Sequence, residues 1–306
     1  MRAGRSATTD RAGRARGLVA INVTGLIFGS AALFGKLPVS PLWIIGVRTV
    51  VATLTLLVWG YFARELRPIP RAHWGTIAAS SAVQAVSWVL FYSTVQLGSV
   101  AIATLTFATF PLFALLIDAW HLRRRPRLLE LGATGAIIAA VYLVVGSSPT
   151  AGGRWGVVAG LGAAMLYALY WHLGRSLRPA LSETLISISQ CALVAMAVAP
   201  LLLFVGRAPT RLSEWGWLVW FGAVNTALAG QLYFYALRHL SAGSCSAFVA
   251  MEPVYAISFA ALIFNDPISP RTAVGGAVIL GASYLLSRVE SDPAISPSGA
   301  PDGHEI

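Results

Sequence analysis

Residues 41–62 read PLWIIGVRTVVATLTLLVWGYF, an apolar run that contains a single charged side chain, Arg48. A helix that crosses a bilayer needs roughly 17–25 mostly apolar residues, and this run has that length. Pro41 lies at its start, where proline is tolerated in the first turn of a helix. The stretch therefore predicts a membrane-spanning helix.

Nine further stretches of the chain qualify as spans, so the predicted fold class is an all-α integral membrane protein with ten transmembrane helices. Charged residues make up only 11% of the chain and hydrophobic residues 57%. A soluble domain carries roughly 25% charged residues, which excludes most soluble folds. The other nine predicted spans are residues 18–35, 74–96, 99–119, 128–146, 154–173, 183–205, 214–237, 242–264 and 271–287.

The two ends of the chain are polar. Residues 1–17 carry five arginines and no long apolar run, and we expect a disordered basic arm on the cytoplasmic side. A signal peptide is the competing interpretation because Leu18 starts an apolar stretch, but no small-residue cleavage pattern follows it. Residues 288–306 are rich in Ser, Pro and Gly, and we expect a disordered cytoplasmic tail.

The positive charges are distributed unevenly over the predicted loops. If the N-terminus lies inside and the spans alternate, the inside segments hold sixteen Lys and Arg and the outside segments hold five. Cytoplasmic loops of membrane proteins carry this excess. We therefore expect a multi-pass protein of the cell (inner or plasma) membrane with both termini in the cytoplasm. The net charge of +10 is explained without a nucleic-acid partner.

Short motifs recur at a nearly constant separation and indicate an internal repeat. The Phe-Tyr pair at residues 91–92 recurs at residues 234–235, 143 residues later, and Pro111 recurs as Pro253, 142 residues later. Each match is weak alone, but several in register indicate two related halves.

The predicted halves are residues 18–146 and 154–287, joined by a linker at residues 147–153. Each half holds five spans, and an odd number forces the halves to insert with opposite orientation. Inverted repeats are a recurring design of secondary transporters, in which two near-equivalent halves move around a shared central site.

Two longer stretches resemble the EamA-type members of the drug/metabolite transporter superfamily. Residues 28–57 read FGSAALFGKLPVSPLWIIGVRTVVATLTLL and are similar to the family's opening motif, with Phe28 where Trp is usual. Residues 237–286 contain the Glu-Pro-Val of the family's hallmark at residues 252–254. Asn265-Asp266 stands where the family usually has Gly-Glu, so an acid is kept but shortened.

The resemblance covers about residues 18–287. It implies ten helices, both termini in the cytoplasm and a central cavity lined mainly by helices 1, 3, 4, 6, 8 and 9. Known members mostly export amino acids, other small metabolites or drugs.

Two charged residues within predicted spans are candidates for function. A carboxylate at Glu252 is costly in a bilayer unless it is paired, hydrated or protonated, so it is a candidate for proton coupling or for binding a substrate amine. The alternative is a structural carboxylate that neighbouring groups satisfy. For Arg48 we favour a structural tie to Glu252, Asp266 or helix-end carbonyls over a clamp for a substrate carboxylate, because unpaired intramembrane cations are rare.

The prolines at equivalent places in the two halves predict helix breaks. Pro111 and Pro253 each remove a helix hydrogen bond and free the carbonyls of Phe107 and Val249. Matched breaks point to a binding site, and the alternative is a kink that only shapes packing.

Polar and aromatic residues within the spans could line the cavity. Amides inside a bilayer must find partners, so each of them could also hydrogen-bond between helices. As a set they favour a moderately polar, aromatic-lined substrate site, and its members are Asn22, Gln84, Trp88, Tyr92, Tyr167, Tyr170, Trp171, Asn225 and Gln231.

The function that fits these features is a secondary transporter or facilitator, which exports amino acids or related amphipathic solutes by alternating access. We expect small-molecule substrates, the lipid bilayer and protons as partners, no cofactor or metal, and a monomer or homodimer. The alternatives are a lipid-headgroup flippase and a membrane-embedded lipid-modifying enzyme. The sequence has no GxxxxGK[ST] motif, which disfavours ATP-driven transport, and no HExxH motif, which disfavours zinc-dependent hydrolysis. We therefore expect a protein that is not an enzyme.

Overall fold

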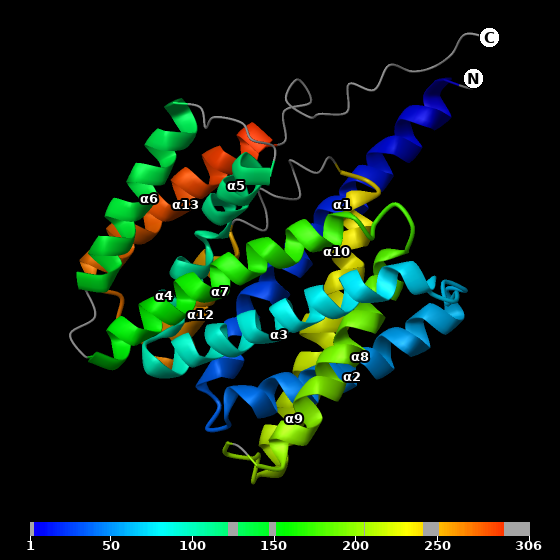
Figure 1. Cartoon of the computed structure of the whole chain (residues 1–306). Coiled ribbons are helices and arrows are strands. Elements are labelled where there is room, and N and C mark those ends of the chain that lie inside the picture. Colours follow the sequence, from blue (N-terminus) through cyan, green and yellow to red (C-terminus); the bar gives the residue numbers. More distant parts are fainter. Residues whose placement is uncertain (1–2, 122–127, 147–150, 205, 241–250, 291–306) are drawn as a thin grey trace.

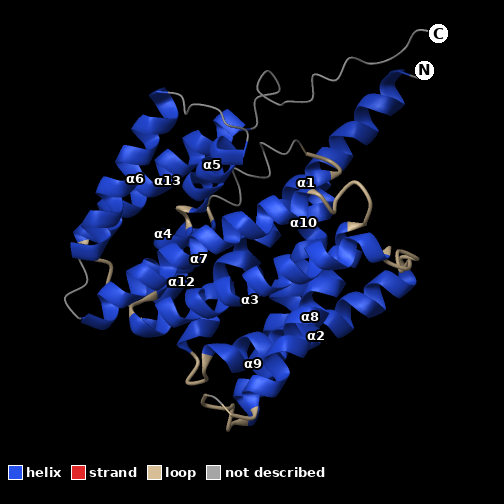
Figure 2. Cartoon of the chain, viewed as in Figure 1, coloured by secondary structure: helices blue, strands red, loops and turns tan. Residues whose placement is uncertain are grey.

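The computed structural model describes residues 3–121, 128–146, 151–204, 206–240 and 251–290. Within these residues every regular element is a helix, which confirms the all-helical fold class (Figure 2). In chain order the elements are α1 (Ala3–Ala31), η1 (Ala32–Lys36), α2 (Pro41–Phe62), η2 (Arg71–His73), α3 (Trp74–Leu97), α4 (Val100–Phe107), α5 (Phe110–His121), α6 (Leu128–Gly146), α7 (Ala151–Arg175), α8 (Glu183–Leu202), α9 (Leu212–Trp220), the π-helix η3 (Phe221–Leu228), α10 (Ala229–Leu237), α12 (Glu252–Phe264) and α13 (Pro270–Glu290).

Several helical segments are suited to a lipid environment. Large apolar side chains stay exposed along them: Leu54, Val58 and Trp120 keep 60%, 59% and 82% of their surface accessible. A multi-pass membrane protein explains such faces, while the ten-span arrangement stays a prediction. Among the described residues, the six helical segments long and apolar enough to cross a membrane are Ala15–Lys36, Pro41–Phe62, Arg71–Leu97, Val100–His121, Gly152–Arg175 and Glu183–Leu202.

The chain ends are more helical than expected. Helix α1 starts at Ala3, within the segment that the sequence predicts to be a disordered arm. This segment is rich in Ala and Arg, which favour helix, and it has no proline to stop the helix. Helix α13 likewise continues to Glu290, and the rest of the predicted tail, residues 291–306, lies outside the described residues.

Local sequence explains where many helices begin and end. The side chains of Ser99 and Ser182 cap α4 and α8 by accepting hydrogen bonds from the amides of residues 102 and 185, at 3.2 and 3.3 Å. Pro41 lies in the first turn of α2. Asn265 ends α12 with φ of 51°, the left-handed conformation that commonly terminates helices.

The helices form a bundle in which two outer pairs enclose the inner helices. Helix α6 packs on α13 at one side, and α2 packs on α8 at the other (Figure 1). Between them, α3 packs on α7, α1 packs on α10, and α4 contacts both α7 and α12. The largest buried cluster combines residues from both sequence halves, among them Phe34, Ile45, Tyr92, Phe221 and Ala256.

The bundle has two ends at which its helices are connected. The Lys36 end holds residues 36–41, 206–212 and 265–270, and the Arg178 end holds residues 62–74 and 175–183. Helix α1 begins and α13 ends on the same side of the molecule, at the top of Figure 1.

Candidate functional site

Arg48 is the charged residue around which the interior of the bundle is organised. It lies two turns into α2 and is partly buried. Its Nε donates a hydrogen bond to Thr226 Oγ1 at 2.8 Å, and the same threonine hydroxyl donates to the Phe221 carbonyl at 3.2 Å. Residues from α2 and η3 thus fix one edge of the guanidinium.

Two aromatic rings hold the faces of the guanidinium. Arg48 Cζ lies 4.0 Å from the ring centroid of Trp88 and 4.6 Å from that of Phe221. Phe34 stacks on Phe221 with ring centroids 4.3 Å apart, and Tyr92 meets Phe221 edge-on at 5.9 Å. Cation–π contacts are worth about 0.5–1 kcal/mol when exposed and about 2 kcal/mol or more when desolvated, so they stabilise a charge away from water.

Among the described residues, Arg48 forms no direct ion pair with Asp266 or with Glu252, and Glu252 interacts with it only at longer range. Asp266 pairs instead with Lys36, whose Nζ lies 2.8 Å from Asp266 Oδ1. Over the described stretches of chain, no carboxylate oxygen lies within 4.0 Å of the Arg48 nitrogens. The reason is position: Asp266 follows α12 at the Lys36 end, whereas Arg48 lies deeper in the bundle.

Residues of α3, α7, α8 and α12 nevertheless converge on Arg48. The guanidinium interacts electrostatically with Tyr92, Tyr167, Cys191 and Glu252. Glu252 is the first residue of α12, and residues 241–250 before it lie outside the described part. The predicted residues Glu252, Arg48, Trp88, Tyr92 and Tyr167 therefore share one region of the bundle interior.

The π-helix η3 supplies Asn225 and Thr226 to this region. Asn225 Nδ2 donates to the Ile27 carbonyl at 2.6 Å and to Ser30 Oγ at 2.8 Å, which joins η3 to α1. Its Oδ1 is buried and has no partner within the described chain. Single π-turns inside helices are rare and frequently occur at functional sites.

The helix that begins at Val100 is interrupted one turn before Pro111. Helix α4 ends at Phe107 and α5 starts at Phe110. The Ala108 carbonyl in the break accepts a hydrogen bond from Ser283 Oγ of α13 at 2.8 Å. In the second half, Pro253 lies in the first turn of α12, and Val249 falls outside the described residues.

Aromatic rings line the inner surface from this break along α7. Phe107 contacts Tyr167 with ring centroids 4.8 Å apart, and Tyr167 stacks on Tyr170 at 5.7 Å. Trp171 follows, and the Arg178 guanidinium lies 4.4 Å from the centroid of its ring. The aromatic residues predicted on this span thus form one continuous series.

Three hydrogen-bonded polar side chains lead inward from the Arg178 end. They are Tyr170, Gln190 and Ser80, here called the polar file. Tyr170 hydroxyl donates to Gln190 Oε1 at 3.1 Å, and Gln190 Nε2 donates to Ser80 Oγ at 2.9 Å. Gln84 and Trp88 follow Ser80 at four-residue intervals, so all three lie on one face of α3. The polar file therefore leads from Tyr170 towards Trp88, whose ring lies against the Arg48 guanidinium.

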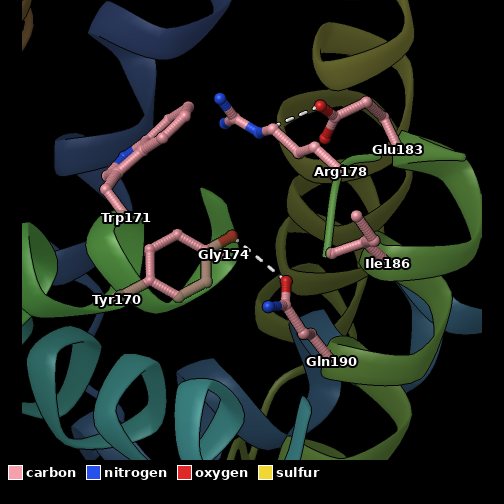
Figure 3. Close-up of a pocket in the computed structure, with 7 residues that line it drawn as sticks. All are labelled: Tyr170, Trp171, Gly174, Arg178, Glu183, Ile186 and Gln190. Atoms are coloured by element: carbon pink, nitrogen blue, oxygen red, sulfur yellow. Dashed lines mark hydrogen bonds and ion pairs between the residues drawn. The ribbon is translucent and has the colours of Figure 1, made fainter. Parts of the chain in front are cut away.

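A pocket opens at the outer start of the polar file (Figure 3). Its volume is about 20 Å³, room for about one water molecule. Figure 3 shows the Arg178–Glu183 ion pair, with Nε 3.1 Å from Oε1, opposite the Tyr170–Gln190 hydrogen bond. The residues that line it are Tyr170, Trp171, Gly174, Arg178, Glu183, Ile186 and Gln190.

The Lys36 end is closed by several contacts. The Lys36–Asp266 ion pair joins η1 to the segment after α12. The amide of Ser40 donates to the Arg207 carbonyl at 3.0 Å, and the rings of Trp43 and Trp215 meet edge-on at 5.9 Å. These contacts lie between the bundle centre and that end.

Two of the predicted site residues lie away from Arg48. Asn22 is exposed on α1, and its amide donates to the Leu18 carbonyl of the same helix at 2.7 Å. Gln231 on α10 accepts a long hydrogen bond from Thr184 Oγ1 at 3.5 Å, and its buried Nε2 has no partner in the described chain.

Some site residues were missed by the sequence argument. Gln190 and Ser80 are polar residues inside apolar runs, the signal that identified Gln84, and applying it evenly would have found them. Phe221 and Thr226 carry no such signal, because phenylalanine and threonine are ordinary in membrane helices. In the described residues, no group of three His, Cys, Asp or Glu side chains could hold a metal ion.

Comparison with known families gives the decisive observation. The model of the EamA-like transporter family matches residues 15–146 and 154–288. The chain belongs to this family. The resemblance seen in the opening and Glu-Pro-Val motifs is thereby confirmed.

Several relatives of this EamA-like chain are named as transporters. An uncharacterized transporter of Archaeoglobus fulgidus is 22% identical over 275 residues, which cover 89% of this chain and 96% of that protein. Phosphoenolpyruvate/phosphate translocator 3, chloroplastic, of Oryza sativa subsp. japonica is 28% identical over 252 residues, 76% of this chain and 63% of that protein. GDP-fucose transporter 1 of Dictyostelium discoideum is 26% identical over 161 residues, 49% and 44% of the two chains.

The fold of the EamA-like chain also occurs among solved structures. One crystal structure superposes with a TM-score of 0.61 at 17% identity, and the match covers 91% of this chain and 98% of the other. At this identity the likeness concerns the fold alone. A role in transport therefore rests on the family and on the named relatives.

Proposed function

We propose that this EamA-like protein is a secondary transporter that exports amino acids or related amphipathic solutes by alternating access through a central site. The observation that carries the proposal is the interior position of Arg48, reached by the polar file from the Arg178 end and closed off at the Lys36 end. Polar side chains that lead towards a central charge from one end only suit a protein that admits solute to that charge from one side at a time.

The contacts between helices support two inverted five-helix repeats. In such repeats each helix of the first half has a counterpart in the second half. The pairs would be α1 with α7, α2 with α8, α3 with α9–α10, α4–α5 with α12, and α6 with α13. Exchanging the halves then turns the α3–α7 contact into the α10–α1 contact, and both contacts occur. The α4–α7 contact becomes α12–α1, and the α2–α8 and α6–α13 contacts map onto themselves. A two-fold relation of this kind is typical of secondary transporters.

Topology and location belong to the same proposal. With ten spans and an internal N-terminus, the Arg178 end and both termini lie in the cytoplasm, and the Lys36 end lies outside. The arginine-rich loops then face the cytoplasm of a cell membrane, as the positive-inside rule requires.

The direct test is solute flux in proteoliposomes. We expect the purified protein to move at least one member of a panel of amino acids, their analogues and small organic anions faster than empty liposomes do. The named relatives carry a phosphorylated acid and a nucleotide sugar, so both chemical types belong in the panel. A panel-wide absence of flux in correctly inserted protein would contradict the proposal.

Glu252 is the residue that we propose for proton coupling. It lies at the start of α12, is partly buried and interacts electrostatically with Arg48. Glu252→Gln removes the proton-binding group at nearly constant volume, so we expect transport to be lost or uncoupled from the pH gradient while expression stays intact. The measurement is flux with and without a pH gradient.

The control for this variant is Glu65→Gln, which changes a carboxylate in the loop after α2. It should transport at the wild-type rate. Normal pH-dependent flux in the Glu252→Gln protein would show that coupling resides elsewhere.

A lipid-headgroup flippase is the second candidate because of one surface feature. An open, mostly apolar groove of about 470 Å³ runs between α1 and α10, with Arg16 at its edge and Val19, Val23 and Leu232 among its walls. Such a groove could admit an acyl chain. Scrambling of fluorescent phospholipids in proteoliposomes, without flux of water-soluble solutes, would favour this function.

A further inference from the structure

The Arg48 guanidinium is oriented but forms no direct ion pair among the described residues, and Glu252 acts on it only at longer range. Trp88 and Phe221 hold its plane and Thr226 holds its Nε, so the two terminal nitrogens keep a fixed direction. No carboxylate among the described residues lies within 4.0 Å of them. The terminal nitrogens of an arginine form a fork that matches carboxylate and phosphate oxygens with two parallel hydrogen bonds.

Two buried oxygens on the helices that carry these rings also lack partners. Gln84 Oε1 and Asn225 Oδ1 receive no hydrogen bond from the described chain, although the two side chains are only 7% and 3% exposed. Gln84 precedes Trp88 by four residues on α3, and Asn225 follows Phe221 by four residues on η3. A residue with an unpartnered amide oxygen therefore lies about one helical turn along the chain from Trp88, and another lies about one turn from Phe221.

Leaving such groups unpaired is costly in the absence of a ligand. A buried acceptor without a donor costs roughly as much as a lost hydrogen bond, and a cation inside a bilayer is more costly still. Almost all buried polar groups in native proteins have a partner, so groups of this kind call for a bound water, ion or ligand. One cation and two acceptors in the same region define a ligand with an anionic end and a hydrogen-bond donor.

We propose that Arg48 forms an oxyanion subsite of the transport path, which holds the carboxylate or phosphate of the solute while Gln84 Oε1 accepts a hydrogen bond from a donor group on it. This subsite rests on the proposed transport function, because it assigns the solute's chemistry to that path. The polar file gives the approach, since Ser80, Gln84 and Trp88 lie along one face of α3 between the pocket and Arg48.

The test compares three probes that share a benzene ring, of which the first two differ only in one group. L-Phenylalanine carries a carboxylate, L-phenylalaninamide replaces it with a neutral amide, and phenyl phosphate carries the other oxyanion. Binding is measured by isothermal titration on purified protein in detergent, and flux is measured separately in proteoliposomes. We expect at least one oxyanion probe to bind wild type ~10-fold or more tightly than the amide, the discrimination expected from charge-assisted hydrogen bonds.

Substitution of Arg48 should remove this discrimination. Arg48→Gln should bring the ratio of affinities close to one, and Arg48→Lys should keep a reduced preference because the charge remains without the fork. The matched control is Arg271→Gln, which removes an exposed arginine that contacts the Gly146 carbonyl at 3.3 Å. This control should keep the wild-type ratio. Whichever oxyanion probe depends on Arg48 identifies the source as carboxylate or phosphate.

Gln84→Met gives a second test that does not require replacing a charge. The substitution keeps the size of the side chain and removes the unpartnered oxygen, and Gln84 makes no hydrogen bond in the described chain that would be lost. We expect a higher melting temperature without probe and several-fold weaker binding of L-phenylalanine. A purely structural role of Gln84 predicts the opposite, a lower melting temperature.

The outcomes separate the subsite from the transport function. An equal probe preference in wild type and in folded Arg48→Gln or Arg48→Lys overturns the subsite even if flux is normal, and so does wild type that binds neither oxyanion probe. If binding depends on Arg48 as expected and no panel solute is transported, the subsite stands and the transport function fails.

Discussion

At the scale of single residues, the site depends on a close approach between two backbones. A Cβ atom on Gly222 of η3 would lie 2.6 Å from the Arg48 carbonyl oxygen and 2.6 Å from Val51 Cβ. Backbone atoms cannot move aside cheaply, so only glycine lets η3 lie this near α2. The contact that orients Arg48 through Thr226 depends on this spacing.

We therefore expect Gly222→Ala to destabilise the protein by about 1–3 kcal/mol, the usual cost of overpacking. It should also weaken any binding that depends on Arg48, because η3 must move away from α2. Thermal unfolding in detergent measures the first effect, and probe titration measures the second.

Gly230→Ala is the matched control, since a Cβ there meets nothing within 4 Å. It should be neutral or more stable than wild type by about 0.5–1 kcal/mol, because alanine favours helix over glycine. Equal stability of the two alanine variants would show that α2 and η3 are not held at this distance.

At the scale of elements, the break between α4 and α5 is stabilised by another helix. Ser283 Oγ of α13 donates to the Ala108 carbonyl in the break, and Thr109 Oγ1 donates to the Thr106 carbonyl at 2.6 Å. Side chains therefore satisfy carbonyls that an unbroken helix would bond internally. The break is built into the packing of α13 on α4.

Removing that support should have a measurable cost. We expect Ser283→Ala to destabilise the protein by roughly 0.5–2 kcal/mol, the range of interhelical hydrogen bonds in membranes. Ser176→Ala serves as control, because its exposed hydroxyl bonds only the nearby Leu173 carbonyl. If the two variants unfold at the same temperature, the break does not need α13.

Helices themselves were largely predictable from the apolar runs, because a bilayer admits few other spanning structures. The interruption near Pro111 was also expected. The π-turn at Phe221–Leu228 and the helical start of α1 were not, since the first depends on packing against Arg48 and the second on weak local preferences. For the candidate site, single polar residues in apolar runs predict Arg48, Gln84 and Asn225, and these stay predictions. The hydrogen bond from Arg48 to Thr226 could be found only from the three-dimensional arrangement.

At the scale of the whole molecule, closure at the Lys36 end should control access to the centre. Cys191 is a buried free thiol next to Gln190 of the polar file, and it interacts electrostatically with Arg48. In a Cys245→Ser background, this thiol reports how often the interior opens. The Lys36–Asp266 ion pair is one of the contacts that open access from that end would have to break.

We expect Lys36→Gln to speed the labelling of Cys191 by a membrane-impermeant maleimide added outside proteoliposomes, by roughly 2–5-fold. An ion pair with this exposure contributes at most about 1 kcal/mol, which sets that range. Arg271→Gln, which lowers the charge at the same end without breaking a described ion pair, should label at the wild-type rate. Unchanged labelling in Lys36→Gln would mean that the ion pair does not hold this end closed.

The π-turn in η3 has a consequence for movement. A π-helix accommodates one more residue per hydrogen-bonded turn than an α-helix, so the segment from Leu212 to Leu237 contains one residue of spare length. Passing that residue along the segment would rotate part of it by about 100° without breaking the covalent path or unfolding either end. Thr226 would then rotate away from Arg48, and its hydrogen bond to the guanidinium would break. The same π-turn that orients Arg48 therefore provides the extra residue with which the helix could release it.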